Sequence, residues 1–231
     1  MKTMIPNLLT LARLVLAPVV AWCIWQGFSI PYQAEFGPQA RDLTADAVLT
    51  AQAIGDQYKF AAAGLFVFAA LTDLFDGMAA RAFDADSKFG RILDPIADKA
   101  LVGLPLLVLA YISGFSADET SDTLFSWSNI NIWIAVPVLA IVARDLLITV
   151  LRLFAADGEG APVMMLSKWK TTLELIAVAA PIFIALPFMA TGAVLNSVWL
   201  VLLWAAAILS VLTGVIYLTS TGARREIPGE V

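Results

Sequence analysis

The sequence predicts an all-α polytopic membrane protein with six transmembrane helices and both termini in the cytoplasm. Of its 231 residues, 60% are hydrophobic and 14% are charged, and the mean hydropathy is +0.84. This composition leaves too little polar surface for a soluble domain. The apolar residues gather in runs of about 20, the length at which a helix crosses a bilayer. The segments between the runs are alternately acidic and basic.

Six apolar runs account for most of the chain, so residues 1–231 are interpreted as a single membrane domain. We expect helices at about 8–29, 58–80, 91–113, 130–153, 171–190 and 194–219. The segment 30–57 is expected to be a loop, with an Ala-rich stretch from Leu43 to Ile54 compatible with a short surface helix. No internal repeat is evident, which disfavours a transporter built from inverted repeats.

The placement of charges predicts how the chain is oriented. Basic residues flank the ends of the runs that would lie on one side of the membrane: Lys2, Arg81, Lys88, Arg91, Arg152, Lys168, Lys170, Arg224 and Arg225. The segments on the opposite side, 30–57 and 114–129, are acidic. Since Lys and Arg favour the cytoplasmic side, both termini should be cytoplasmic.

Four aspartates have a spacing that predicts a metal site. Asp73 and Asp76 are three residues apart at the end of the second run, and Asp94 and Asp98 are four apart at the start of the third. Each pair shares one helix face, and four carboxylates meeting at membrane depth would repel one another without cations between them. The sequence has no histidine, so we expect two hard ions, Mg²⁺ or Mn²⁺. The competing interpretation is a set of solvated interfacial charges.

The region around these aspartates resembles the signature of the CDP-alcohol phosphatidyltransferase family. The matching string is Asp73-x-x-Asp76-Gly77-x-x-Ala80-Arg81, then eight residues, then Gly90-x-x-x-Asp94-x-x-x-Asp98. All eight positions agree in identity and spacing. Further segments are similar to the bacterial branch that makes phosphatidylglycerophosphate: Ile5 to Arg13, Leu93 to Lys99, Ala143 to Asp145 with Arg152, and Lys168 to Thr172.

The resemblance implies transfer of the phosphatidyl group from CDP-diacylglycerol to sn-glycerol 3-phosphate, with release of CMP. It also implies a bacterial inner (cytoplasmic) membrane and an active site that faces the cytoplasm. By the same resemblance Asp73, Asp76 and Asp94 are metal ligands, and Asp98 is both a ligand and the catalytic base. The implied contacts to the CDP part of CDP-diacylglycerol are Gly77, Arg81 and Ser87. Membrane lipid surrounds such a protein, a homodimer is compatible with the sequence, and no nucleic-acid partner is expected.

The acceptor phosphate needs a cationic site of its own. The candidates are Arg144, Arg152, Lys168 and Lys170, with Thr171 as a hydroxyl donor. Arg144 lies inside an apolar run, where a charge is costly without a partner. Its neighbour Asp145 is expected to point elsewhere on the helix, because adjacent helical residues do not face each other. The alternative interpretation makes the two lysines membrane anchors and the threonine a helix cap.

Two polar residues near the start of the chain, Asn7 and Thr10, are candidate nucleotide contacts for CDP-diacylglycerol. Helix capping explains them almost equally well. Arg13 lies deeper in the first run than an anchor should, but no role is assigned to it.

Two other functions compete with this interpretation. The same chemistry could use a different acceptor, namely inositol phosphate, phosphatidylglycerol or serine, although a basic acceptor site argues against serine. A cation-coupled transporter would also use buried carboxylates, but its binding site usually lies near the midplane of the membrane. The four aspartates lie instead at helix ends beside basic segments, which favours a substrate that carries phosphate.

Overall fold

The computed structural model describes residues 4–83, 88–114, 130–154, 165–186 and 193–225, and side chains within 8–72, 93–114, 130–151, 169–186 and 194–219. The described elements are α1 (Met4–Phe36), the 3₁₀ helix η1 (Ala40–Asp42), α2 (Ala45–Phe83), α3 (Lys88–Ile112), α4 (Ile132–Phe154), α5 (Met165–Ile184) and α6 (Ala193–Arg225). Each expected apolar run overlaps one of the six described α-helices. The all-helical class is therefore confirmed over the part of the chain that is described.

Four of the described helices are long and apolar enough to cross a membrane. These segments are Leu8–Phe36, Leu93–Ile112, Ile132–Leu151 and Val194–Thr219. Their outer surfaces are also apolar: Trp133, Leu139, Val194 and Val201 are among many large hydrophobic side chains left exposed. A soluble protein rarely exposes apolar surface on this scale, which agrees with lipid around the helices. Six spans and cytoplasmic termini stay predictions.

The expected loop over 30–57 is wrong for most of its length. Helix α1 continues to Phe36 and α2 begins at Ala45, so the Ala-rich stretch belongs to a long helix. The two helices approach closely at glycines, because a Cβ on Gly55 would lie 2.3 Å from Cγ of Pro31 and one on Gly27 would lie 3.2 Å from the Gly55 carbonyl oxygen. Small residues permit such close helix packing, and this packing extends both helices beyond their apolar runs.

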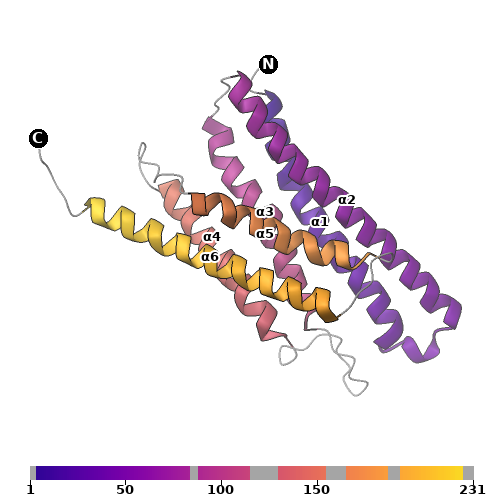
Figure 1. The fold of residues 1–231 in the computed structure, drawn as a ribbon. Helices are drawn as coiled ribbons and strands as arrows, with labels where there is room; N and C mark the ends of the chain where they lie inside the picture. Colours follow the sequence, from indigo (N-terminus) through magenta and orange to yellow (C-terminus); the bar gives the residue numbers. More distant parts are fainter. Residues whose placement is uncertain (1–3, 84–87, 115–129, 155–164, 187–192, 226–231) are drawn as a thin grey trace, which may run out of the picture.

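Helix α3 joins two groups of helices. Helix α1 packs against α2 and α3, whereas α6 packs against α4 and α5, and α3 also packs against α4. Figure 1 shows α3 between the α1–α2 pair and the group of α4, α5 and α6, with the start of α1 and the end of α6 at the same end of the bundle. Buried residues such as Val20, Leu106 and Leu203 form the apolar core between them.

Several polar side chains are buried inside this apolar bundle. The charged ones are Arg13 on α1, Asp145 on α4, and Lys170 and Glu174 on α5. A buried charge is tolerated only when it is paired. These side chains belong to two clusters, each of which includes residues of α3, and the clusters define the candidate site.

Candidate active site

The first cluster holds two of the four predicted carboxylates. Asp94 and Asp98 lie one turn apart on α3, and both are bound by side chains of α1. The Thr10 hydroxyl donates a hydrogen bond to Oδ1 of Asp94, and Arg13 donates from Nη1 to Oδ1 of Asp98 at 2.5 Å. Arg13 Nη2 also lies 3.8 Å from Oδ1 of Asp94. The arginine therefore links both carboxylates.

The two carboxylates are open on the side away from α1. Their side chains are 45% and 48% exposed, whereas Arg13 is 2% exposed. The arginine therefore holds Asp94 and Asp98 from within the bundle, while about half of each carboxylate side chain is accessible to solvent. Thr10 is buried and donates its hydroxyl proton to Asp94. Its predicted contact with CDP-diacylglycerol stays a prediction.

The other members of the predicted aspartate site cannot be placed as side chains. Asp73, Asp76, Gly77 and Arg81 belong to the last turns of α2, but their side chains lie outside the described set. Ser87 and the Asn7 side chain also lie outside it. The convergence of all four aspartates and the predicted nucleotide contacts are therefore untested.

The described carboxylates fit a divalent cation. Among the side chains that the structure describes, no group of three or more potential metal ligands gathers in one place. Asp94 and Asp98 nevertheless supply hard oxygen donors, which Mg²⁺ and Mn²⁺ prefer. Thr10 and Arg13 orient them in the way that outer-sphere partners orient metal ligands.

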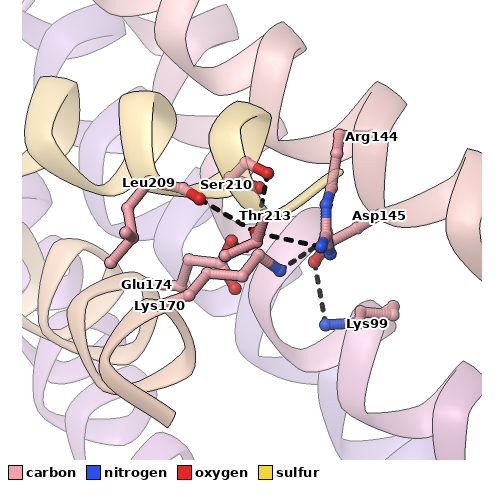
Figure 2. Close-up of polar contacts among 8 residues, drawn as sticks. All are labelled: Lys99, Arg144, Asp145, Lys170, Glu174, Leu209, Ser210 and Thr213. Carbon is pink, nitrogen blue, oxygen red and sulfur yellow. Dashed lines mark hydrogen bonds and ion pairs between the residues drawn. The ribbon is translucent and has the colours of Figure 1, made fainter. Parts of the chain in front are cut away.

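The second cluster is built around Asp145 on α4 (Figure 2). Its Oδ2 lies 2.9 Å from Nζ of Lys99 on α3. Its Oδ1 lies 2.9 Å from Nη1 of Arg144 and 2.5 Å from Nζ of Lys170 on α5. Lys170 also lies 2.9 Å from Oε1 of Glu174, one turn along α5. Five charged side chains from three helices thus form one network.

The contact between Arg144 and Asp145 corrects the expectation that Asp145 points elsewhere. Adjacent residues do diverge by about 100° around a helix, but the Arg144 side chain is long enough to fold back onto the Asp145 carboxylate. The other side of the Arg144 guanidinium contacts α6, since its Nη2 donates a hydrogen bond to Oγ1 of Thr213 at 3.0 Å. A Cβ on Gly214 would lie 2.9 Å from Cγ of Arg144, so the arginine passes directly over this glycine.

The predicted acceptor residues fall into three groups. Arg144 and Lys170 come together on Asp145, whereas Thr171 is exposed on α5 and the side chains of Arg152 and Lys168 lie outside the described set. A membrane anchor would be exposed, so the buried Lys170 does not fit that alternative. Its contact with a phosphate stays a prediction.

Sequence reasoning assigned no site role to several charged residues of these clusters, namely Arg13, Lys99, Asp145 and Glu174. All four carried a usable signal, since each is a charge within an expected apolar run, and such charges are usually functional or paired. Lys99 and Asp145 lay next to assigned residues, where spacing along one helix cannot reveal a partner on another helix.

The sequence is similar to that of known proteins. The family described as CDP-alcohol phosphatidyltransferase matches residues 3–216. CDP-diacylglycerol–glycerol-3-phosphate 3-phosphatidyltransferase of Cereibacter sphaeroides is 34% identical over 180 residues, which cover 78% of this chain and 63% of that protein. The protein of the same name from Rickettsia felis is 31% identical over 215 residues, 92% of each chain. That of Escherichia coli K12 is 33% identical over 123 residues, 52% of this chain and 59% of that protein. No solved structure matches.

Proposed function

We propose that this chain, which belongs to the CDP-alcohol phosphatidyltransferase family, transfers the phosphatidyl group of CDP-diacylglycerol to sn-glycerol 3-phosphate. The products are phosphatidylglycerophosphate and CMP. One structural observation carries the proposal: the half-exposed carboxylates of α3 lie next in sequence to Lys99, which joins a network of three cations around Asp145. The relatives from Cereibacter sphaeroides and Rickettsia felis, which align over most of this chain, bear the name of this reaction.

Two divalent cations, Mg²⁺ or Mn²⁺, are proposed to bind Asp73, Asp76, Asp94 and Asp98. Two such ions would balance the negative charge of four carboxylates. When bound, such ions neutralise the pyrophosphate and stabilise the leaving CMP. The protein's own contribution is orientation. Thr10 and Arg13 fix Asp94 and Asp98 from the buried side, so the exposed sides of these carboxylates keep a constant direction toward the substrate.

Asp98 is proposed as the base that deprotonates the acceptor. With no histidine in the chain, a carboxylate is the group suited to accept this proton near neutral pH. The acceptor hydroxyl oxygen bonds to the phosphatidyl phosphorus, the bond from phosphorus to CMP breaks, and the hydroxyl proton passes to Asp98. The exposure of Asp98 leaves room for the acceptor to approach.

The acceptor phosphate is proposed to bind beside this base. Lys99 follows Asp98 directly, so the two side chains leave α3 about 100° apart, and Lys99 joins Arg144 at Asp145. A phosphate at these cations places its alcohol next to Asp98. This arrangement favours glycerol 3-phosphate or inositol phosphate over serine, because serine offers no phosphate to the cations.

An assay of acceptors in parallel tests the function. Purified protein is given CDP-diacylglycerol with labelled sn-glycerol 3-phosphate, inositol phosphate, phosphatidylglycerol or serine, and lipid product and CMP are both measured. We expect glycerol 3-phosphate to give equal amounts of lipid product and CMP. Preference for another acceptor would contradict the proposal. Ion uptake into vesicles without CMP release would instead support the transporter.

The proposed topology has six spans, both termini in the cytoplasm, and an active site facing the cytoplasm of a bacterial inner membrane. Cys23 is the single cysteine and is buried, so a Cys23→Ser background allows cysteines to be placed one at a time. Cysteines at 85 and 160 should react only after the membrane is permeabilised, and one at 120 should react from outside. External labelling at 85 would contradict the site model. Basic residues around 85 and 160, and acidic residues around 120, support the orientation.

A further inference from the structure

The network around Asp145 contains more positive than negative charge. Its described members are three cations, Lys99, Arg144 and Lys170, and two carboxylates, Asp145 and Glu174. Three positive and two negative groups leave a net charge of +1. A buried network that served structure alone would gain most from balanced charges, since an unpaired buried charge is strongly unfavourable. The surplus therefore suits an anionic ligand.

The members of the network differ in how far they reach the surface. Lys170 and Glu174 have side chains that are 3% and 1% exposed, whereas Lys99 and Arg144 are 25% and 16% exposed. The two α5 residues therefore close the inner side of the network. The other two cations lie on its open side, and Lys99 lies there beside Asp98 in the sequence.

Asp145 is the only described group that contacts all three cations. One carboxylate joins α3, α4 and α5, with Lys99 on Oδ2 and the other two cations on Oδ1. Figure 2 shows these side chains converging on it from separate helices. Its position therefore sets the distance between the head groups of Lys99 and Arg144.

We propose that Asp145 is a positioning residue for the acceptor: it holds Lys99 and Arg144 as a two-pronged site for the acceptor phosphate, while Lys170 and Glu174 anchor Asp145 from the closed side. This inference rests on the proposed function, and it revises the roles within the predicted acceptor set. Arg144 contacts the phosphate and Lys170 does not. Lys99 is added as the second contact.

Helix α6 fixes the direction of the Arg144 prong. Thr213 Oγ1 donates its proton to the Leu209 carbonyl oxygen at 2.9 Å, so its lone pairs can accept from Nη2 of Arg144. The absence of a side chain at Gly214 lets Arg144 pass, because a Cβ there would also lie 3.1 Å from Nε. Thr213 and Gly214 should therefore affect acceptor binding without contacting the acceptor.

Steady-state kinetics of purified variants test the role of Asp145. Asp145→Asn should raise KM for the acceptor roughly tenfold or more and leave KM for CDP-diacylglycerol within about twofold. Asp145→Glu restores the charge and should recover part of this loss. The matched control is Asp56→Asn, which removes the carboxylate of the 2.9 Å pair with Lys59 far from the site and should change neither constant.

A second pair of variants keeps the test valid if Asp145→Asn does not fold. Thr213→Val preserves shape but removes the hydrogen-bond acceptor, and Gly214→Ala displaces the arginine. Each should raise KM for the acceptor about three- to tenfold with little change in unfolding temperature.

Two kinds of failure can be told apart. If wild-type protein uses glycerol 3-phosphate but the Asp145 and α6 variants keep a normal acceptor KM, or both KM values rise equally, Asp145 has only a structural role. If wild-type protein prefers another phosphorylated acceptor, the proposed function fails, and the same variants assayed with that acceptor decide the role of Asp145. Preference for serine would contradict both proposals.

Discussion

Two carboxylate clusters, one on α3 and one around Asp145 of α4, differ in how their charges are satisfied. Asp94 and Asp98 each receive a donor from α1 and remain about half exposed. Asp145 is buried and is surrounded by three cations. A carboxylate with an open side can exchange ligands, whereas a carboxylate enclosed by cations holds its neighbours in place. Burial, rather than residue type, therefore separates the carboxylates expected to take part in chemistry from the one expected to position its neighbours.

The largest effect should come from metal removal, which acts on the open cluster alone. Excess EDTA should reduce activity below detection, and added Mg²⁺ or Mn²⁺ should restore it, because the exposed carboxylates depend on a cation. The unfolding temperature in detergent should change little, since the Asp145 network supplies its own cations. Full activity in chelator would contradict the metal site.

The next effect concerns the proposed base. Asp98→Asn should lower kcat by about 10²–10⁴-fold, the usual contribution of a general base, because the amide cannot accept the proton. Binding of CDP-diacylglycerol, measured by calorimetry, should be retained. Asp42→Asn, a change at an exposed residue of η1, is the control. An Asp98→Asn variant with near-normal kcat would show that another group accepts the proton of the acceptor hydroxyl.

Disruption of the enclosed cluster around Asp145 should lower the stability of the fold. Lys170→Met leaves Glu174 buried without its 2.9 Å partner and should lower the free energy of unfolding by about 3–5 kcal/mol. The double variant Lys170→Met/Glu174→Leu should recover most of this loss. Denaturant unfolding in micelles measures both.

The control for this experiment is the more exposed Lys59–Asp56 pair. Lys59→Met should cost less, because both side chains of this pair are more exposed and water screens their charges. If Lys170→Met were stable but had a raised acceptor KM, Lys170 would be a phosphate contact after all. The proposal that Lys170 only anchors Asp145 would then be wrong.

The smallest of these effects concerns Arg13, which orients the open cluster. Arg13→Ala should raise the Mg²⁺ concentration for half-maximal activity about 10–100-fold, as loss of an outer-sphere partner does. Arg13→Lys should have a smaller effect because it keeps the charge. Arg41→Ala, an exposed change, is the control. A lower Mg²⁺ requirement would show that Arg13 competes with the ion instead of orienting its ligands.

Much of the fold could be predicted from local patterns. The six helices follow the apolar runs because each run is a continuous stretch whose hydrophobicity does not depend on distant residues. The lengths of α1 and α2 were underestimated, since both helices continue through polar residues where Gly27 and Gly55 allow close contact. That contact belongs to a pair of helices, and no pattern within either one reveals it.

By itself, the sequence determined the family signature and the expected carboxylate chemistry, because helical spacing places Asp94 and Asp98 on one face wherever α3 lies. Only the tertiary structure decided which charges meet. It placed Arg13 on Asp98, folded Arg144 back onto Asp145 and buried Lys170 between two carboxylates. The physical reason is that pairing and burial arise between helices, whereas a sequence pattern reports on one helix at a time.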